Sequence, residues 1–259
     1  MAYNTVTYHA GHTQGGGARG SGYEESAVAR QFAPVLAAAF AKVGQRTVDC
    51  TDNVSTTQNA NINRLISLCN AVDSNGRLDI SLHFNASDDA SATGVEVLYY
   101  DQVGLAGKVS AAIAKAAGYR DRGPKERKDL GVLRGTNAPA ILIELAFITN
   151  ADDMRKFFAN MQAIANAIVQ AVTGKTVSGG GSVPNSGGKW VLKTGGVGVP
   201  EAQECMNKLA EFGTKGSLVY EGNGIFYVIT EPVTDRNALG AINWYFADYR
   251  KWFVELYQV

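Results

Sequence analysis

The stretch Leu78-Asp79-Ile80-Ser81-Leu82-His83 decides the fold of the first part of this chain. Its apolar and polar side chains alternate with the period of a β-strand, and Asn75-Gly76 supplies a turn before it. The pattern ends at His83, one of 3 histidines among 259 residues. A histidine placed where a strand opens into a loop is a candidate site residue if other polar residues lie near it in space.

Strand and helix patterns alternate on both sides of this stretch. Strand patterns cover residues 5–10, 45–50, 94–100 and 140–143, and helical spacing covers residues 24–43, 57–72, 104–117 and the segment that begins at 150 or 151. Residues 140–143 are continuously apolar, as in a strand buried on both faces. We therefore expect an α/β domain with a mostly parallel, twisted sheet and helices on both faces. Residues 120–129, of mixed charge, are expected to form a loop.

Composition and charge narrow the classes of function. The chain is 46% hydrophobic and carries 24 Lys and Arg against 24 Asp and Glu, so its formal net charge is zero. We expect no binding to nucleic acid by long-range attraction. No apolar run reaches the roughly 20 residues that span a bilayer, so no membrane insertion is expected. The first residues lack the pattern of a signal peptide, which predicts a cytoplasmic start.

A second, smaller domain follows a segment rich in glycine and serine. We place the boundaries at residues 1–175 for the first domain, 176–188 for a flexible linker and 189–259 for the second domain. The patterns after the linker predict the order βαββαβ, an α+β fold. This part contains no histidine and no coherent set of catalytic residues. Its aromatic residues are expected mainly in the core.

Three side chains lie at predicted strand ends in the first domain: His12, His83 and Glu144. The carboxyl ends of parallel strands meet at one edge of a sheet, which predicts that the three share a site. A carboxylate directly after four core residues is costly to bury unless it is paired or used. The glycine-rich loop at residues 11–20 formally matches a dinucleotide-binding pattern, but no helix opens directly after Gly20, so we reject that interpretation.

These residue types suit a zinc hydrolase. Two neutral imidazoles and a glutamate at a helix start, Glu24 or Glu25, are zinc ligands that leave one position open for water. A separate glutamate nearby is suited to take and return protons. Zinc lowers the pKa of a bound water to about 7, which makes hydroxide available at neutral pH.

Four motifs occur in a recognisable order. They are Gly11-His12, Tyr23-Glu24-Glu25-Ser26, Leu82-His83-Phe84-Asn85-Ala86-Ser87, and Ile143-Glu144 with Phe147-Ile148-Thr149-Asn150 after it. In this order residues 1–175 resemble the zinc-dependent N-acetylmuramoyl-L-alanine amidases of the amidase type 3 family, the type found in phage endolysins and bacterial autolysins.

The resemblance implies a role for particular residues. One zinc ion per catalytic domain would be held by His12, Glu25 and His83, and Glu144 would be the catalytic acid and base. Glu25 is preferred to Glu24 because the family's ligand lies about two turns before the apolar segment at residues 33–36. Substrate contacts are expected at Asn85 and Arg134. His9 has no family role and is expected to be structural.

The implied substrate is bacterial peptidoglycan, cut between N-acetylmuramic acid and the L-alanine of the stem peptide. We expect an endolysin that stays in the host cytoplasm until lysis and then acts on the cell wall. Residues 189–259 would be a cell-wall-binding module whose polymer ligand the sequence does not identify. Two alternatives stay open: a non-catalytic cell-wall-binding protein, and a zinc peptidase that cuts within the stem peptide.

Overall fold

The computed structural model describes residues 3–89, 91–177, 188–234, 236–250 and 252–259. The chain forms two compact units, which are taken separately below. The first comprises Met1–Phe157 and Gln162–Ser178, and the second comprises Phe158–Met161 and Gly179–Val259. Most of the predicted linker, residues 178–187, lies outside the described residues. Among the described helices, none combines the length and the apolarity needed to cross a bilayer.

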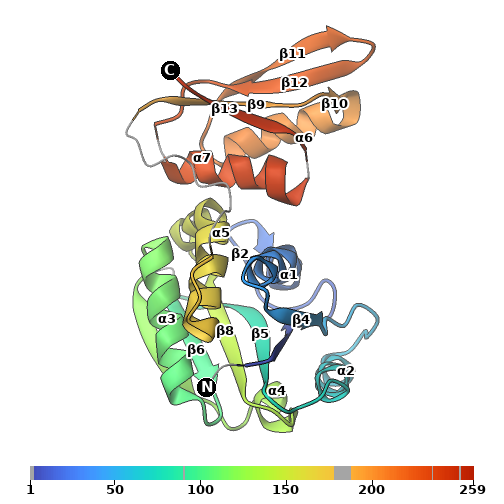
Figure 1. Ribbon diagram of the computed structural model, residues 1–259, viewed down its shortest axis with the longest axis vertical. Helices are drawn as coiled ribbons and strands as arrows, with labels where there is room; N and C mark the ends of the chain where they lie inside the picture. The colour runs from blue at the N-terminus through green and yellow to red at the C-terminus, as the bar shows by residue number, and fades with distance from the viewer. Residues whose placement is uncertain (1–2, 90, 178–187, 235, 251) are drawn as a thin grey trace. The chain divides into compact units, whose positions relative to one another are not determined.

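A six-stranded sheet forms the centre of the first unit (Figure 1). Its strands are β1 (Thr5–Ala10), β4 (Arg46–Asp49), β5 (Arg77–Asn85), β6 (Val95–Tyr99), β7 (Asp121–Glu126) and β8 (Ala140–Phe147), in the order β4-β1-β5-β8-β6-β7. Strands β4, β1, β5 and β8 are mutually parallel, whereas β6 runs antiparallel to β8 and parallel to β7. The predicted mostly parallel sheet is thus confirmed. A short ribbon of β2 (Arg19–Gly20) and β3 (Tyr23–Glu24) stands apart from it.

Helices cover both faces of this sheet. They are α1 (Glu25–Lys42), α2 (Gln58–Asn70), α3 (Val103–Ala117), α4 (Gly131–Gly135) and α5 (Ala151–Thr173). Helix α5 lies between α1 and α3 in Figure 1, and its Phe157 ring stands 5.4 Å from Phe32 of α1 and 4.8 Å from Phe84 of β5. On the other face, Leu65 of α2 and Leu142 of β8 belong to one buried apolar cluster that includes residues of α4.

Polar residues of β1 and β5 are buried beneath the second of these faces. Arg77 and Asp79 form an ion pair, with Nε to Oδ1 at 2.8 Å and Nη2 to Oδ2 at 3.0 Å, and Thr7 donates a hydrogen bond to the same carboxylate. His9 is 1% exposed and lies beside Ser81. The alternation that predicted β5 therefore reflects polar side chains that satisfy one another, rather than one face in water.

Some boundaries differ from the sequence prediction. Residues 121–126 form β7, where a loop was predicted, because an edge strand pairs through its backbone and can carry charged residues, Gly and Pro. Strand β8 continues through Glu144 to Phe147, and His83 lies inside β5 instead of at its end. The short helix α4 was not predicted, since five residues give too little periodicity to detect.

The second unit follows the predicted βαββαβ order with one short extra strand. Its elements are β9 (Trp190–Thr194), β10 (Val197–Gly198), α6 (Val199–Glu211), β11 (Gly216–Gly222), β12 (Ile225–Thr230), α7 (Arg236–Asn243), the π-helical η1 (Trp244–Tyr249) and β13 (Val254–Gln258). The sheet pairs β11, β12, β9 and β13 antiparallel, in that order, and Figure 1 shows α6 and α7 on the same face of it. Tyr245 and Phe246 are buried as expected, whereas Phe253 is 67% exposed.

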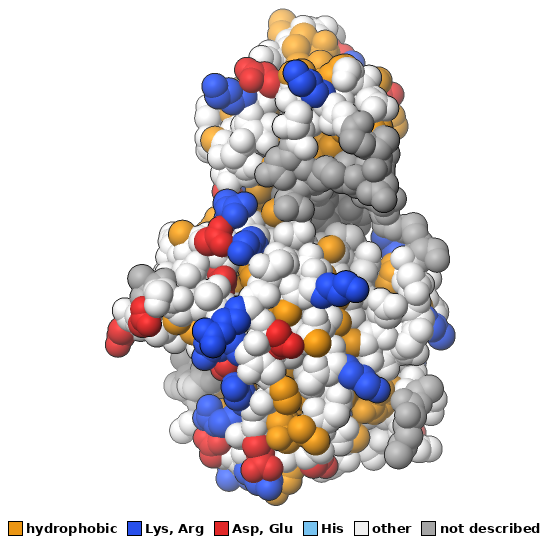
Figure 2. All heavy atoms as spheres, turned by 90° about the vertical axis from the view of Figure 1, so that its left-hand side faces the viewer, with side chains coloured by type: hydrophobic (Ala, Val, Ile, Leu, Met, Phe, Trp, Pro, Cys, Tyr) orange, Lys and Arg blue, Asp and Glu red, His pale blue; other side chains and the backbone are white. Residues whose placement is uncertain are grey.

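Charged side chains of both signs are interspersed on the face shown in Figure 2, and apolar side chains gather there only in small groups. Neither sign dominates that face, in keeping with the equal numbers of acidic and basic residues in the chain.

Candidate metal centre

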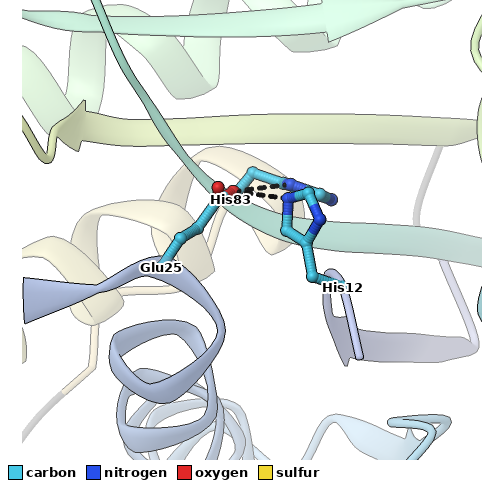
Figure 3. Close-up of side chains that lie close together, drawn as sticks. All are labelled: His12, Glu25 and His83. Carbon is cyan, nitrogen blue, oxygen red and sulfur yellow. Dashed lines mark hydrogen bonds and ion pairs between the residues drawn. The ribbon is translucent and has the colours of Figure 1, made fainter. Parts of the chain in front are cut away.

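Three side chains from separate elements of the first unit converge at one point. His12 lies just after β1, Glu25 is the first residue of α1, and His83 lies on β5. Their ligand atoms all lie within 4.8 Å of one another. Figure 3 shows both imidazoles directed at the Glu25 carboxylate, with His12 Nε2 at 3.0 Å and His83 Nδ1 at 2.9 Å from Oε1. The structure thus brings together the three residues expected to bind the metal.

The glycine-rich loop makes room for this group. His12 itself has φ of 62°, in the left-handed region where a residue with a side chain is strained. A Cβ added at Gly11 would lie 2.1 Å from the His83 imidazole, and one added at Gly17 would lie 2.7 Å from Glu25 Oε2. Gly11 and Gly17 therefore allow close packing around the three side chains.

Glu25 is buried and fully engaged. Its Oε1 accepts a hydrogen bond from the Phe84 backbone N–H at 3.1 Å, and its Oε2 accepts one from the Ala18 N–H at 2.8 Å. Burial alone would raise the pKa of Glu25, but the hydrogen bonds with His12 and His83 hold this pKa well below its ordinary value. Glu24 instead pairs with Arg19 at 2.8 Å and is not one of the residues whose ligand atoms lie together. The geometry thus favours Glu25 over Glu24 as the ligand.

A glutamine orients the His12 ring. The Nδ1 atom of His12 lies 3.4 Å from Oε1 of Gln58, the first residue of α2. An amide oxygen can only accept, so Gln58 favours a proton on Nδ1. A metal bound at Nε2 would then replace the proton that Nε2 donates to Glu25. Sequence reasoning missed Gln58, because only the folded loop brings it to His12. His9 is not part of the group: burial lowers its pKa to about 3, which keeps it neutral.

Glu144 stands beside these residues with one oxygen unpaired. It pairs in register with His83 on β5 and lies opposite Glu96 on β6. Its Oε2 is buried and has no hydrogen-bond partner among the described residues. Burial, together with the charges of Glu25 and Glu96, raises the pKa of Glu144 to about 8, and Arg127 opposes this effect. A carboxyl group of this kind can both donate and accept a proton near neutral pH.

One cavity of about 430 Å³ joins the metal group to Glu144. Asn85 lines the cavity and its Nδ2 donates to Glu96 Oε1 at 2.8 Å. Arg134, the other expected substrate contact, is exposed on α4 and is not among the lining residues. Arg127 does line the cavity, although the sequence pointed only to a mixed-charge loop there.

The donor set fits zinc. Two imidazole nitrogens and one carboxylate oxygen are the ligands of many catalytic zinc sites, in which the fourth position is kept for water or substrate. Here Gln58 contacts His12, two backbone N–H groups hold Glu25, and all three donor residues line the cavity.

Comparison with known proteins agrees with this geometry. The catalytic domain of the CD27L endolysin, which targets Clostridia difficile, is 29% identical with a TM-score of 0.60, and the match covers 68% of this chain and 100% of that domain. The probable cell wall amidase LytH of Staphylococcus epidermidis is 36% identical over 97 residues, which are 36% of this chain and 33% of LytH. N-acetylmuramoyl-L-alanine amidase LytC of Bacillus subtilis is 37% identical over 109 residues, 39% of this chain and 21% of LytC.

These curated relatives are matched over a third of their length or less. The family model described as N-acetylmuramoyl-L-alanine amidase, in contrast, matches residues 6–174, which hold all of the first unit's sheet except Thr5 and every residue of the candidate metal centre. The resemblance drawn from the four motifs is confirmed, and the chain belongs to the N-acetylmuramoyl-L-alanine amidase family of type 3.

Proposed function

We propose that this chain is a zinc-dependent hydrolase that cuts the amide between N-acetylmuramic acid and the L-alanine of the peptidoglycan stem peptide. Family membership supports the substrate class. The observation that carries the proposal is the buried, unpaired Oε2 of Glu144, in the same cavity as His12, Glu25 and His83. A non-catalytic wall-binding protein has no use for such a costly carboxyl group.

Each residue has a defined task in this mechanism. His12, Glu25 and His83 would hold the zinc, which supplies a polarised carbonyl and a water of lowered pKa. Glu144 accepts the proton of the attacking water and then returns it to the departing amine of L-alanine. Gln58 keeps the Nε2 lone pair of His12 available, while the Ala18 and Phe84 N–H groups hold the Glu25 carboxylate in place.

Mass spectrometry of fragments released from purified peptidoglycan tests the bond that is cut. We expect stem peptides with a free L-alanine amine, lost on chelation and restored by zinc. New ends within the stem peptide would instead identify a zinc peptidase. Intact glycan-peptide bonds, together with the lack of bound zinc in the folded protein, would identify a wall-binding protein without catalysis.

For the cellular role we propose an endolysin, which is kept in the host cytoplasm until lysis. Support comes from the similarity to the catalytic domain of an endolysin at 29% identity. The relatives named as cell wall amidases leave an autolysin as the competing role. Production in bacterial cytoplasm should leave cells intact until a membrane-permeabilising agent is added, after which they should lyse. Lysis without the agent would favour a protein that reaches the wall by itself.

Residues 189–259 are proposed to be the cell-wall-binding domain, after a linker at 176–188 and a catalytic domain at 1–175. Since α6 and α7 cover one face of its sheet, the other face is open (Figure 1). Val228 and Thr230 of β12 are buried, so the alternation of this strand puts Tyr227 on the opposite face. Lys193 Nζ lies 3.9 Å from the centroid of the Tyr227 ring. In a catalytically inactive full chain, Tyr227→Ala should weaken binding to purified cell walls. Unchanged binding would place the wall contact elsewhere.

A further inference from the structure

Arg127 occupies a position on the wall of the catalytic cavity that the proposed mechanism does not use. It is the one Lys or Arg among the described residues lining this cavity, where the other titratable groups are Glu25, Glu144 and two histidines. Its backbone N–H donates to the carbonyl of Tyr99, at the end of β6, at 2.9 Å. The main chain that carries this cation is thereby fixed to the central sheet.

The side chain of Arg127 is oriented by a neighbouring carboxylate. Its Nε and Nη2 each donate to Asp129, at 2.8 Å to Oδ1 and 2.8 Å to Oδ2. A guanidinium has five N–H donors, so this pair uses two of them. Within the described part of the chain Nη1 donates no hydrogen bond, and the side chain is 45% exposed. Arg127 is therefore held in place with donors left for a further anion.

The charge of Arg127 reaches the catalytic end of the cavity. Arg127 lowers the pKa of Glu144 against the larger, opposing effect of burial, and Glu144 in turn contributes, after Asp129, to raising the pKa of Arg127. Arg127 and Glu144 also line the same cavity, so a ligand group bound to Arg127 would share that cavity with Glu144.

Much of the wall of this cavity is apolar. This apolar arm is formed by residues of α2, β6, β8 and the segment around α4: Ile62, Leu65, Leu98, Leu130, Val132 and Leu142. Sugar hydroxyl groups would lose their hydrogen bonds to water against such a wall, whereas a methyl side chain would gain from burial there. The arm therefore suits the peptide side of the substrate, and its one cation suits a carboxylate on that peptide.

We propose that Arg127 is a specificity-determining residue, which binds the free carboxylate on the stem-peptide residue that follows L-alanine, while the apolar arm receives the alanine methyl group. The proposal rests on the proposed function and specifies its substrate. The enzyme would then distinguish two kinds of peptidoglycan: one in which the residue after L-alanine carries a free carboxylate, and one in which that group is an amide.

The test compares two soluble, uncrosslinked glycan-chain substrates that differ only at this group, one with D-glutamate and one with D-isoglutamine after L-alanine. We expect the wild-type chain to have the lower KM for the carboxylate substrate. Arg127→Gln should raise that KM about tenfold, with a much smaller effect on KM for the amide and on kcat, because only a charge-assisted contact to the carboxylate is lost. Arg127→Lys should restore part of the preference.

Lys128→Gln is the matched control, since it removes the same charge one residue away, from a side chain that pairs with Glu126 and does not line the cavity. It should leave both KM values unchanged. An equal effect of Arg127→Gln on both substrates would show that Arg127 acts only through Glu144 and would overturn the proposal. Hydrolysis of both substrates without a wild-type preference would also overturn it while leaving the proposed function intact; hydrolysis of neither would reject the proposed function itself.

Discussion

Glu144 on β8 lies in register with His83 on the neighbouring parallel strand β5. The proposed acid and base and a proposed metal ligand are therefore placed by backbone hydrogen bonds of adjacent strands, and not by loops. A functional group on such a rigid element is held in position more precisely than one on a loop. Because the backbone places both residues, Glu144 can be substituted while His83 keeps its position.

Glu144→Gln should separate catalysis from metal binding. The amide cannot accept the proton of the attacking water, so we expect turnover to fall at least about a thousandfold. The three ligands are untouched, so the zinc content measured by elemental analysis should stay at one per chain. Normal turnover in this variant would rule out the assigned role, and loss of zinc would show that Glu144 also supports the metal.

The same substitution has a consequence for stability. In the metal-free protein the pKa of Glu144 is raised to about 8, above its ordinary 4.5, mainly by burial. The folded state then retains a proton that the unfolded state releases, so this group lowers stability as pH rises from 4.5 towards 8. With chelator present, Glu144→Gln should exceed the wild type in free energy of unfolding by about 4 kcal/mol at pH 8, and by little at pH 4.5.

Urea denaturation followed by far-UV circular dichroism checks this expectation. All 3 tryptophans, at positions 190, 244 and 252, belong to the second unit, so tryptophan fluorescence reports that unit and serves as an internal control. The fluorescence transition should be the same in both proteins. A variant that is no more stable than the wild type at pH 8 would mean that Glu144 is ionised without strain in the folded state.

Three residues of this site could be predicted from the sequence because each follows a strand pattern. His12, His83 and Glu144 could be joined through the rule that parallel strands end at one edge. Glu25 required the family resemblance, since a helix-start acid next to Glu24 has an equally good explanation in the helix dipole. The structure separates the two by their partners, the histidines for Glu25 and Arg19 for Glu24.

Residues that reach the site through tertiary packing were not predictable from local pattern. Gln58 contacts His12 across 46 positions of sequence, and Arg127 directly follows the edge strand β7, in a segment whose charged composition indicates only a solvated loop. The polar layer of Thr7, Asp79 and Arg77 was equally hidden, because alternation alone does not tell a solvent-facing strand from one whose polar groups are paired in the core.

The glycine loop offers a matched pair of substitutions. Gly17→Ala places a methyl group 2.7 Å from Glu25 Oε2 and 2.8 Å from the His12 ring, so it should displace a ligand and weaken zinc binding at least about tenfold. Gly15 has a similar positive φ, 78° against 82°, yet a Cβ there meets nothing within 4 Å. Gly15→Ala therefore carries the same backbone strain without the collision.

Competition with a fluorescent chelator gives the zinc affinity of both variants. Gly15→Ala should bind zinc like the wild type apart from a small loss of stability. If both variants lose affinity equally, backbone strain and not contact with Glu25 and His12 is the cause. If neither does, the loop is more adaptable than its packing indicates.

His9 should make the first unit sensitive to acid. Burial lowers its pKa from 6.5 to about 3, so the unfolded state binds a proton below pH 6.5 that the folded state does not. The free energy of unfolding therefore does not suffer from this group above pH 6.5. It falls as the pH is lowered, by about 3 kcal/mol between pH 7 and pH 4.

His9→Asn keeps a polar group beside Ser81 but cannot take up a proton in this range. Measured with chelator present, its free energy of unfolding should therefore fall less steeply over this interval than that of the wild type, even if the variant is less stable at pH 7. Parallel curves for the two proteins would mean that His9 does not titrate on unfolding and that buried carboxylates alone cause the acid sensitivity.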